Sequence, residues 1–425
     1  MERGSHKKQD GKYHIYGQNK GAVKLLLLVS VLLVSGFLVF SFFIKGCLFK
    51  PKMEQVIVIA IDTLRADHVS EYGYKRPTTP VLDRFAREEA SIFLNAYSSS
   101  SWTLPSTVSL MTGLHPHQHG VEDRGKKLHP GLPTLAKAYS NAGFMTAAFV
   151  THIYVSSLFG IESGFDSFFE LSIDWNFKEG KQLRAAELNQ AVFPWLAKHK
   201  NKTFFLYLHY FDPHWDYDAP GKFKNRFTRK DYKGPANGTW WFIKKYIPQS
   251  KRLQQEDLNH IKGLYDGEIA YTDHHIGQLF DEIKRLGMWT SSTIVILSDH
   301  GEEFQDHGSM HHIRTLYEEV LKVPMMIKLQ GGRKPGQRPI ISERVQTFDI
   351  APTLLELSGV KIPKTFEASS LVPLLRRSGK DRPIFARTRR HESDQVTLIY
   401  QDHKMIVPFS KRSGKIELYD INLDP

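Results

Sequence analysis

Short apolar runs alternate with longer amphipathic stretches along most of this 425-residue chain. The run 56–61 (VIVIAI) is apolar throughout and rich in β-branched residues, which is typical of a strand buried on both faces of a parallel sheet. Further strands are expected at 146–150, 203–210 and 292–297, and helices at 80–90, 132–142, 183–199 and 258–287. This alternation predicts an α/β fold in which helices sandwich a mostly parallel sheet.

The alternation weakens toward the C-terminus, where apolar segments are shorter. Antiparallel strands are expected at 398–400, 404–407 and 415–419. We therefore expect a main α/β domain over 56–375 and a small antiparallel C-terminal subdomain over 376–425. Within the main domain, the segment 215–250 is rich in aromatic residues, glycine and proline, and is expected to be a loop at the rim of the substrate site.

The stretch 25–44 (LLLLVSVLLVSGFLVFSFFI) contains no charged residue and is long enough, at 1.5 Å per residue, to cross a bilayer core of about 30 Å. A buried globular helix and a cleaved signal peptide are the alternatives. The run exceeds the apolar core of a signal peptide, and no small-residue cleavage site follows it. We expect a transmembrane signal anchor at 25–44, between a basic segment at 1–24 and a linker at 45–55.

Charge near this run predicts its orientation. More Lys and Arg residues precede it than directly follow it, so the N-terminus is expected to be cytoplasmic and the main domain extracytoplasmic, either periplasmic or extracellular. The net charge of +12 suits an anionic partner. The chain has no zinc-finger spacing and no basic helix suited to reading bases, so a nucleic-acid partner is not expected.

Three polar side chains directly follow two of the expected strands: Asp62 after 56–61, and Asp299 with His300 after 292–297. The carboxyl ends of parallel strands share one edge of a sheet, which is where ligands bind in open α/β folds. Carboxylate and imidazole groups are suitable ligands for a divalent cation that activates a sulfate or phosphate ester. For any one aspartate alone, capping of the next helix is the structural alternative.

Thr103, in the segment WTLPS at 102–106, is the candidate nucleophile. A threonine hydroxyl is unreactive at neutral pH unless a metal or a base activates it, so Thr103 would also contact the cation. Capping of a helix that starts near Val108 is the alternative role.

Histidines form a second set of candidates. The group at 307, 311 and 312, and His214 in the segment FDPHW at 211–215, can donate to an ester oxygen or protonate a leaving group. For the group at 115, 117 and 119 a structural role is favoured, because the spacing is not that of a metal site.

Blocks of sequence from residue 56 to the C-terminus follow a recognisable order. They include IDTLRADH at 61–68, WTLPS at 102–106, SDHGEE at 298–303, LYEE at 316–319 and DIAPT at 349–353. In this order they resemble the sulfatase family of the alkaline-phosphatase superfamily.

The resemblance implies an alkaline-phosphatase-like fold with 56–375 as its catalytic domain, and a divalent cation (Ca, Mg, Mn or Zn). It implies metal ligation by Asp62, Asp299 and His300, a nucleophile at Thr103, and substrate contacts by His214 and His312. Further, weaker candidates are His152 and His307.

Three positions depart from the formylglycine-dependent sulfatases. Thr103 stands where these enzymes carry Cys or Ser and cannot be converted to formylglycine; Thr107 replaces an Arg, and Thr63 replaces an Asp present in many members. A threonine nucleophile on this fold resembles phosphodiesterases and the membrane-anchored phosphoethanolamine or glycerol-phosphate transferases.

Three hypotheses follow for the function. The first is a membrane-anchored, metal-dependent hydrolase that cleaves a sulfate or phosphate ester of a glycan or lipid through Thr103. The second is a transferase that moves a phosphoryl-linked headgroup to a lipid or glycan. The third, a catalytically silent anion-binding domain, has no need for a metal set beside a hydroxyl, so an enzyme is favoured.

Overall fold

The computed structural model describes residues 54–171, 183–248, 250–390, 393–409 and 414–423. The expected anchor at 25–44 and the basic segment at 1–24 lie outside these residues. Within the described ranges, no helix combines the length and the apolar character that a membrane crossing requires.

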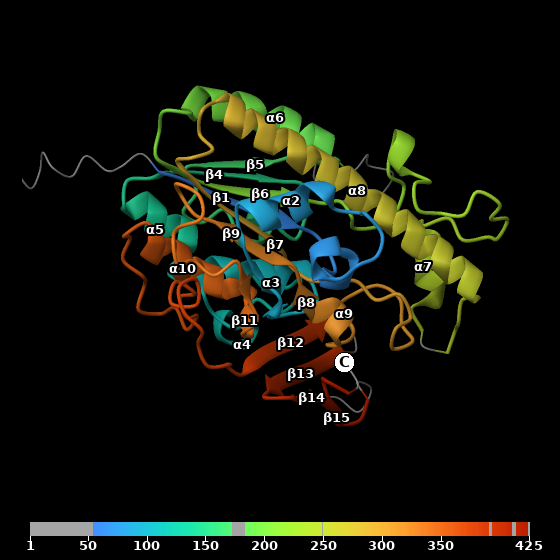
Figure 1. The fold of residues 1–425 in the computed structure, drawn as a ribbon. Coiled ribbons are helices and arrows are strands. Elements are labelled where there is room, and N and C mark those ends of the chain that lie inside the picture. The colour runs from blue at the N-terminus through green and yellow to red at the C-terminus, as the bar shows by residue number, and fades with distance from the viewer. Residues whose placement is uncertain (1–53, 172–182, 249, 391–392, 410–413, 424–425) are drawn as a thin grey trace, which may run out of the picture. The chain divides into compact units, whose positions relative to one another are not determined.

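A central eight-stranded sheet has the order β10-β2-β9-β7-β1-β6-β4-β5 (Figure 1). The strands are β1 (Gln55–Ile61), β2 (Ser91–Phe93), β4 (Met145–Val150), β5 (Ser167–Glu170), β6 (Phe204–Tyr210), β7 (Ser292–Ser298), β9 (Met325–Lys328) and β10 (Ile340–Ile341). Strands β7, β1, β6, β4 and β5 run parallel, whereas β9 is antiparallel to both of its neighbours. The prediction of a mostly parallel sheet is confirmed.

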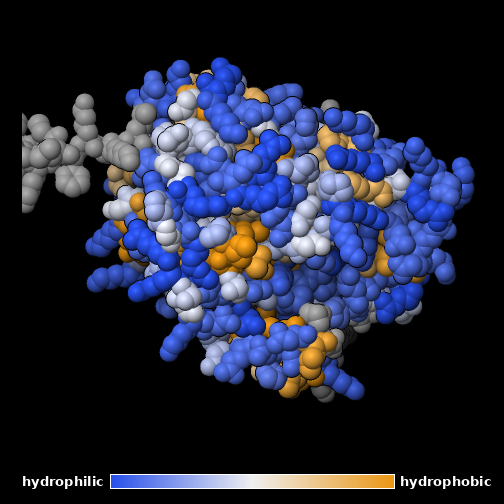
Figure 2. Space-filling view, viewed as in Figure 1, coloured by the Kyte–Doolittle hydropathy of each residue, from blue (hydrophilic) through white to orange (hydrophobic). Residues whose placement is uncertain are grey.

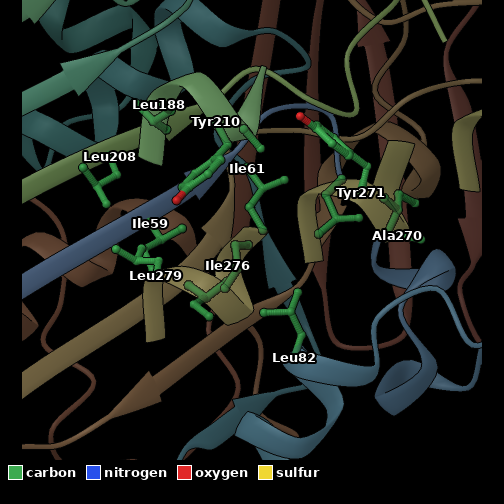
Figure 3. Packing of buried hydrophobic residues seen from close by; sticks show 14 of the residues in the cluster. Ile59, Ile61, Leu82, Leu188, Leu208, Tyr210, Ala270, Tyr271, Ile276 and Leu279 are labelled. Carbon is green, nitrogen blue, oxygen red and sulfur yellow. The ribbon is translucent and has the colours of Figure 1, made fainter. Parts of the chain in front are cut away.

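Helices cover both faces of this sheet because successive side chains of each strand point to opposite sides. On one face Ile59 and Ile61 of β1 pack against α2 (Pro80–Glu88), α6 (Ala185–His199) and α8 (Gln255–Arg285), as Figure 3 shows for Leu82, Leu188, Ile276 and Leu279. On the other face Val56, Val58 and Ala60 join a second core with α3 (Thr103–Thr112), α5 (Leu135–Asn141) and α10 (Ile350–Leu357). The apolar runs of the sequence are therefore buried on both sides.

The C-terminal part forms a four-stranded antiparallel sheet, as predicted. Its strands are β12 (Ile384–Arg390), β13 (Ser393–Tyr400), β14 (His403–Pro408) and β15 (Glu417–Asp420). Ile384, Ala386 and Ile399 on its inner side pack against Val320 and Leu321, which belong to α9 (Glu318–Leu321). Figure 2 shows a mainly hydrophilic surface, with apolar side chains gathered over this sheet. The domain boundary at residue 375 remains a prediction.

The remaining elements are short. A three-stranded sheet has the order β11 (Val345–Gln346), β3 (Ala96–Tyr97) and β8 (Lys322–Val323). Single-turn helices are α4 (Pro116–His119) and α7 (Trp240–Ile243). Helix α7 lies in the segment 215–250, which otherwise consists of 3-10 turns and loops among its described residues, in keeping with the expected irregular insertion.

Candidate active site

Three neighbouring parallel strands end at one edge of the central sheet. The register pairs Ile61 of β1 with Tyr210 of β6 and with Ser298 of β7, so Asp62 and Asp299 follow strand ends that lie side by side. The Asp62 amide donates to the Tyr210 carbonyl at 3.0 Å, which fixes the backbone where the strand ends. The predicted convergence of the two aspartates therefore follows directly from strand pairing.

The two carboxylates are buried and incompletely satisfied. Neither oxygen of Asp62 has a hydrogen-bond partner, and Oδ2 of Asp299 also has none. Oδ1 of Asp299 accepts from the backbone amides of Thr63 and His300 at 3.3 and 2.9 Å. Burial and the neighbouring charge of Asp299 raise the pKa of Asp62 well above its usual value. Buried carboxylate oxygens without donors are costly, and a bound cation removes that cost.

The tautomer of His300 follows from its contacts. Nδ1 lies 2.9 Å from the Gly301 carbonyl, which can only accept, so Nδ1 carries the hydrogen in the neutral ring. Burial lowers the pKa of His300, which favours that neutral form. Nε2, which then carries a lone pair, lies 3.1 Å from Thr103 Oγ1 and 3.5 Å from both Asp62 Oδ1 and Asp299 Oδ2. His300 Nε2 therefore accepts from the Thr103 hydroxyl and lies beside carboxylate oxygens that cannot donate to it.

A close backbone contact positions His300. The Gly301 amide donates to the Val320 carbonyl at 3.0 Å, and a Cβ at position 301 would lie only 2.0 Å from the Glu319 carbonyl oxygen. Only glycine permits this approach, so the loop after β7 is held directly against α9.

Thr103 is the first residue of α3 and is buried. The residue before it, Trp102, is the N-cap and makes no side-chain capping hydrogen bond. The Thr103 hydroxyl instead donates to His300 Nε2 at 3.1 Å. The capping role considered for Thr103 is therefore wrong, because its hydroxyl is directed to the strand-end cluster.

His209 belongs to this cluster although sequence reasoning did not single it out. His209 lies in β6 opposite Ala60 of β1 and is fully buried, and its Nε2 lies 3.8 Å from Asp299 Oδ2. Ligand atoms of Asp62, His209 and Asp299 all lie within 4.8 Å of one another. The available signal was a single histidine inside the apolar strand FFLYLHY, on the face that also carries Phe205 and Tyr207.

The predicted residues His214 and His312 lie beside the same cluster. The ring centroid of His312 is 4.4 Å from that of His300 and 5.1 Å from that of His214. His214 Nδ1 lies 3.1 Å from the Trp215 carbonyl and so carries the hydrogen, which leaves a lone pair on Nε2. Burial lowers the pKa of His214 to about 3. His312 Nδ1 lies 3.1 Å from Glu302 Oε1, and Tyr217 donates to the other oxygen of this carboxyl group.

His152, a weaker candidate, has the opposite tautomer. Its Nδ1 accepts from the Tyr154 amide at 3.2 Å, so Nε2 carries the hydrogen in the neutral ring. Its ligand atom lies within 4.8 Å of those of Asp62 and His214, and its pKa is held well below the usual value by burial. Unlike His214 and His300, whose Nδ1 hydrogens go to backbone carbonyls, His152 can donate from Nε2 while neutral.

Other histidine candidates have structural contacts. His307 lies 2.8 Å from Glu319 Oε1 and stacks on Tyr317 at 3.6 Å. His115 and His117 pack on Phe385, and His119 lies 3.1 Å from Ser109 Oγ. None of these belongs to the groups whose ligand atoms converge among the described residues. This agrees with the structural role favoured for positions 115, 117 and 119.

Backbone strain is concentrated at this edge of the sheet. Thr63 has φ of 56°, His311 of 75° and Ile313 of 90°, all in the left-handed region that β-branched and bulky residues avoid. Thr63 directly follows Asp62, and the other two flank His312. Such strain persists only where surrounding contacts over-determine the backbone, and it clusters at functional sites.

Comparisons with known proteins identify the family of this chain. Residues 54–360 match the sulfatase family model, and residues 306–425 match the model of the C-terminal region of N-sulphoglucosamine sulphohydrolase. An arylsulfatase of Clostridium perfringens is 23% identical over 434 residues, covering 87% of this chain and 88% of the relative. An N-acetylglucosamine-6-O-sulfatase of Bacteroides thetaiotaomicron is 23% identical over 470 residues, covering 88% and 82%.

Solved structures share the fold. A protein in complex with its substrate D-glucosamine-2-N,6-O-disulfate superposes with a TM-score of 0.72 at 21% identity, covering 88% of this chain and 92% of that one. A phosphonate monoester hydrolase of Agrobacterium radiobacter gives a TM-score of 0.71 at 18% identity, covering 88% and 90%.

Proposed function

This chain belongs to the sulfatase family of the alkaline-phosphatase superfamily, and we propose that it hydrolyses a sulfate or phosphate ester with Thr103 as its nucleophile. The single observation that carries the proposal is the contact of the Thr103 hydroxyl with His300 Nε2 at 3.1 Å, next to buried carboxylate oxygens that have no donor. A hydroxyl that merely caps a helix would not share a buried cluster with two such carboxylates.

The unpartnered groups fit a divalent cation. The residues that would hold it are Asp62, His209, Asp299 and His300. Thr103 Oγ1 lies beside these groups, in contact with His300 Nε2. When bound, such a cation polarises an ester oxygen and neutralises the charge that develops in the transition state. The mixture of carboxylate and imidazole groups suits zinc or manganese better than calcium, which prefers an all-oxygen set.

The protein's own groups have separate tasks. His300 Nε2 has one lone pair and serves one partner at a time, either the Thr103 hydroxyl hydrogen or a cation. His152, which has a hydrogen on Nε2, is the neutral donor for an ester oxygen. His214 presents a lone pair and becomes a donor only after it takes up a proton. In this assignment His214 takes up the proton that the Thr103 hydroxyl loses on attack and then gives it to the leaving oxygen.

Threonine chemistry favours phosphorus over sulfur. A phosphorylated threonine is hydrolysed by attack of water at phosphorus, whereas a sulfated threonine lacks the elimination route that a formylglycine hydrate provides. The family relatives favour a sulfate ester, and the substrate complex of one structural neighbour favours an anionic saccharide. We therefore propose an anionic saccharide ester as substrate, handled outside the cytoplasm by a protein anchored through 25–44.

The test is turnover of an aryl phosphodiester and an aryl sulfate by purified protein. Thr103→Ala is expected to abolish turnover of whichever ester the parent cleaves. The matched control is Thr112→Ala, because Thr112 lies on the same helix and its hydroxyl donates to the Val108 carbonyl at 2.7 Å. Full activity of Thr103→Ala would disprove the nucleophile, and equal loss in both variants would indicate damage to α3 rather than to the chemistry.

A further inference from the structure

Arg390, the last residue of β12, reaches the active site from the C-terminal sheet. Its guanidinium carbon lies 4.5 Å from the centre of the Trp102 ring and 4.8 Å from that of Tyr154, and it donates to the Tyr154 hydroxyl at 2.7 Å. Trp102 directly precedes Thr103, and Tyr154 lies 5.2 Å from His152 between ring centres. The charge is thus next to the nucleophile segment and to the donor histidine.

Hydrogen bonds hold β12 against both active-site segments. The Arg387 amide donates to the Ser99 carbonyl at 2.9 Å, and the Thr388 hydroxyl donates to the Ile313 carbonyl. The Ile313 amide in turn donates to the Ser101 carbonyl at 2.9 Å. Because side chains alternate along a strand, Thr388 and Arg390 share the face of β12 that meets these segments.

Arg390 differs from its neighbours in lacking an acidic partner. Within the described part of the chain, no carboxylate pairs with it, and its buried Nε has no hydrogen-bond partner. Arg387 contacts Glu122 at 2.9 Å and Asp394 at 3.2 Å, and Arg389 contacts the same two residues at 4.0 and 3.8 Å. The acidic groups of this region are therefore used by the other two arginines.

Arg390 remains a cation although it is partly buried. Burial and the charges of Arg124 and Arg314 lower its pKa to about 10, which still leaves it charged at neutral pH. Arg390 and Arg314 also help to lower the pKa of His311 beside the active site, after the larger effect of burial. A half-buried cation without a counter-charge is unfavourable unless an anion joins it.

We propose that Arg390 binds a second anionic group, a sulfate or a carboxylate, on the same saccharide whose ester reacts at Thr103. This proposal rests on the proposed function, because it takes from it the ester that reacts at Thr103. A guanidinium suits such groups because its planar donors match two oxygens at once. The C-terminal sheet would thus select polyanionic saccharides over singly charged ones.

The test measures binding rather than turnover. In Thr103→Ala protein, calorimetry would compare D-glucosamine-2-N,6-O-disulfate with D-glucosamine-6-O-sulfate. We expect the parent to prefer the disulfate, and Arg390→Gln to weaken disulfate binding about tenfold while leaving the monosulfate unchanged. The control is Arg389→Gln on the opposite face of β12, which should change neither. Arg390→Lys gives a second variant, which keeps the positive charge but loses the planar donors.

Three results would overturn the inference: no preference of the parent for the disulfate, an unchanged disulfate affinity in both Arg390→Gln and Arg390→Lys, or an equal loss for the two sugars. The last would mean that Arg390 contacts the reacting ester. Because binding is measured without the nucleophile, a failure of Thr103 as nucleophile in turnover assays would be a separate and distinguishable result.

Discussion

Replacing Asp62 with asparagine should change stability in opposite directions with and without metal. Asp62 and Asp299 are buried, lie within 4.8 Å of each other through their ligand atoms, and share three oxygens without donors. In chelator, the Asp62→Asn amide removes one of two like charges and can donate to Asp299. Neutralising a buried, uncompensated charge of this kind stabilises a fold by about 2 kcal/mol.

The corresponding shift in melting temperature is small but measurable. A unit spanning residues 53–425 has an unfolding entropy of about 0.8 kcal/mol per kelvin, so about 2 kcal/mol raises Tm by about 2–3 °C. Adding a metal at about 100 times its Kd should stabilise the parent by about 2.7 kcal/mol, or about 3–4 °C. Asp62→Asn should lose most of that gain. The variant should therefore have the higher Tm in chelator, and the parent should have the higher Tm with metal.

Differential scanning calorimetry in chelator, and with Ca²⁺, Mg²⁺, Mn²⁺ or Zn²⁺, checks this reversal. The control is Asp266→Asn, because Asp266 is also fully buried but is paired with His68, Tyr74 and Arg76 at 2.7 Å each. That variant should lose about 3 kcal/mol under every condition. A lower Tm for Asp62→Asn in chelator, together with an equal metal shift in both proteins, would refute the metal site.

The remaining predictions concern the loops that carry the site. Arg65 contacts Asp67 and Asp306 at 2.7 and 2.8 Å and, against the opposing effect of burial, lowers the pKa of both, that of Asp67 to about 2. A carboxyl group whose pKa is lowered in the folded protein stabilises the fold at pH values above its pKa in the unfolded chain, near 4, and this stabilisation is lost as the pH falls toward 2. Arg65→Gln should therefore flatten the change in Tm between pH 6 and pH 3. A pH profile of Tm that is unchanged in this variant would contradict the prediction. Gly301→Ala should displace His300 and lower kcat about 100-fold in steady-state assays, since a Cβ would meet the Glu319 carbonyl at 2.0 Å; wild-type kcat would show that this contact does not position the site.

Sequence reasoning predicted the members of the candidate site that follow apolar runs, and the structure brings them together. Asp62, Asp299 and His300 were predictable because the end of a parallel strand is a defined place in the fold, and neighbouring strand ends meet. His209 was missed because it lies inside a strand, where a histidine is more often a buried structural residue.

Other features depend on contacts between distant segments. The hydrogen positions on His152, His214 and His300 follow from backbone groups that each ring meets only in the fold. The place of Arg390 depends on how β12 docks against the segments around Ser99 and Ile313, and no local pattern in the chain encodes that docking. Local periodicity predicts elements and their ends, whereas the tertiary arrangement decides which side chains share a site.

The central claim is that Thr103 attacks the ester and becomes covalently modified. Accurate-mass analysis of the peptide containing Thr103, after rapid quenching of the protein with the ester that it cleaves, tests this directly. We predict a phosphoryl or sulfuryl adduct on Thr103 that appears during turnover and is absent from Thr103→Ala. Turnover by the parent at its normal rate without any adduct on this peptide, together with activity retained by Thr103→Ala, would contradict the account.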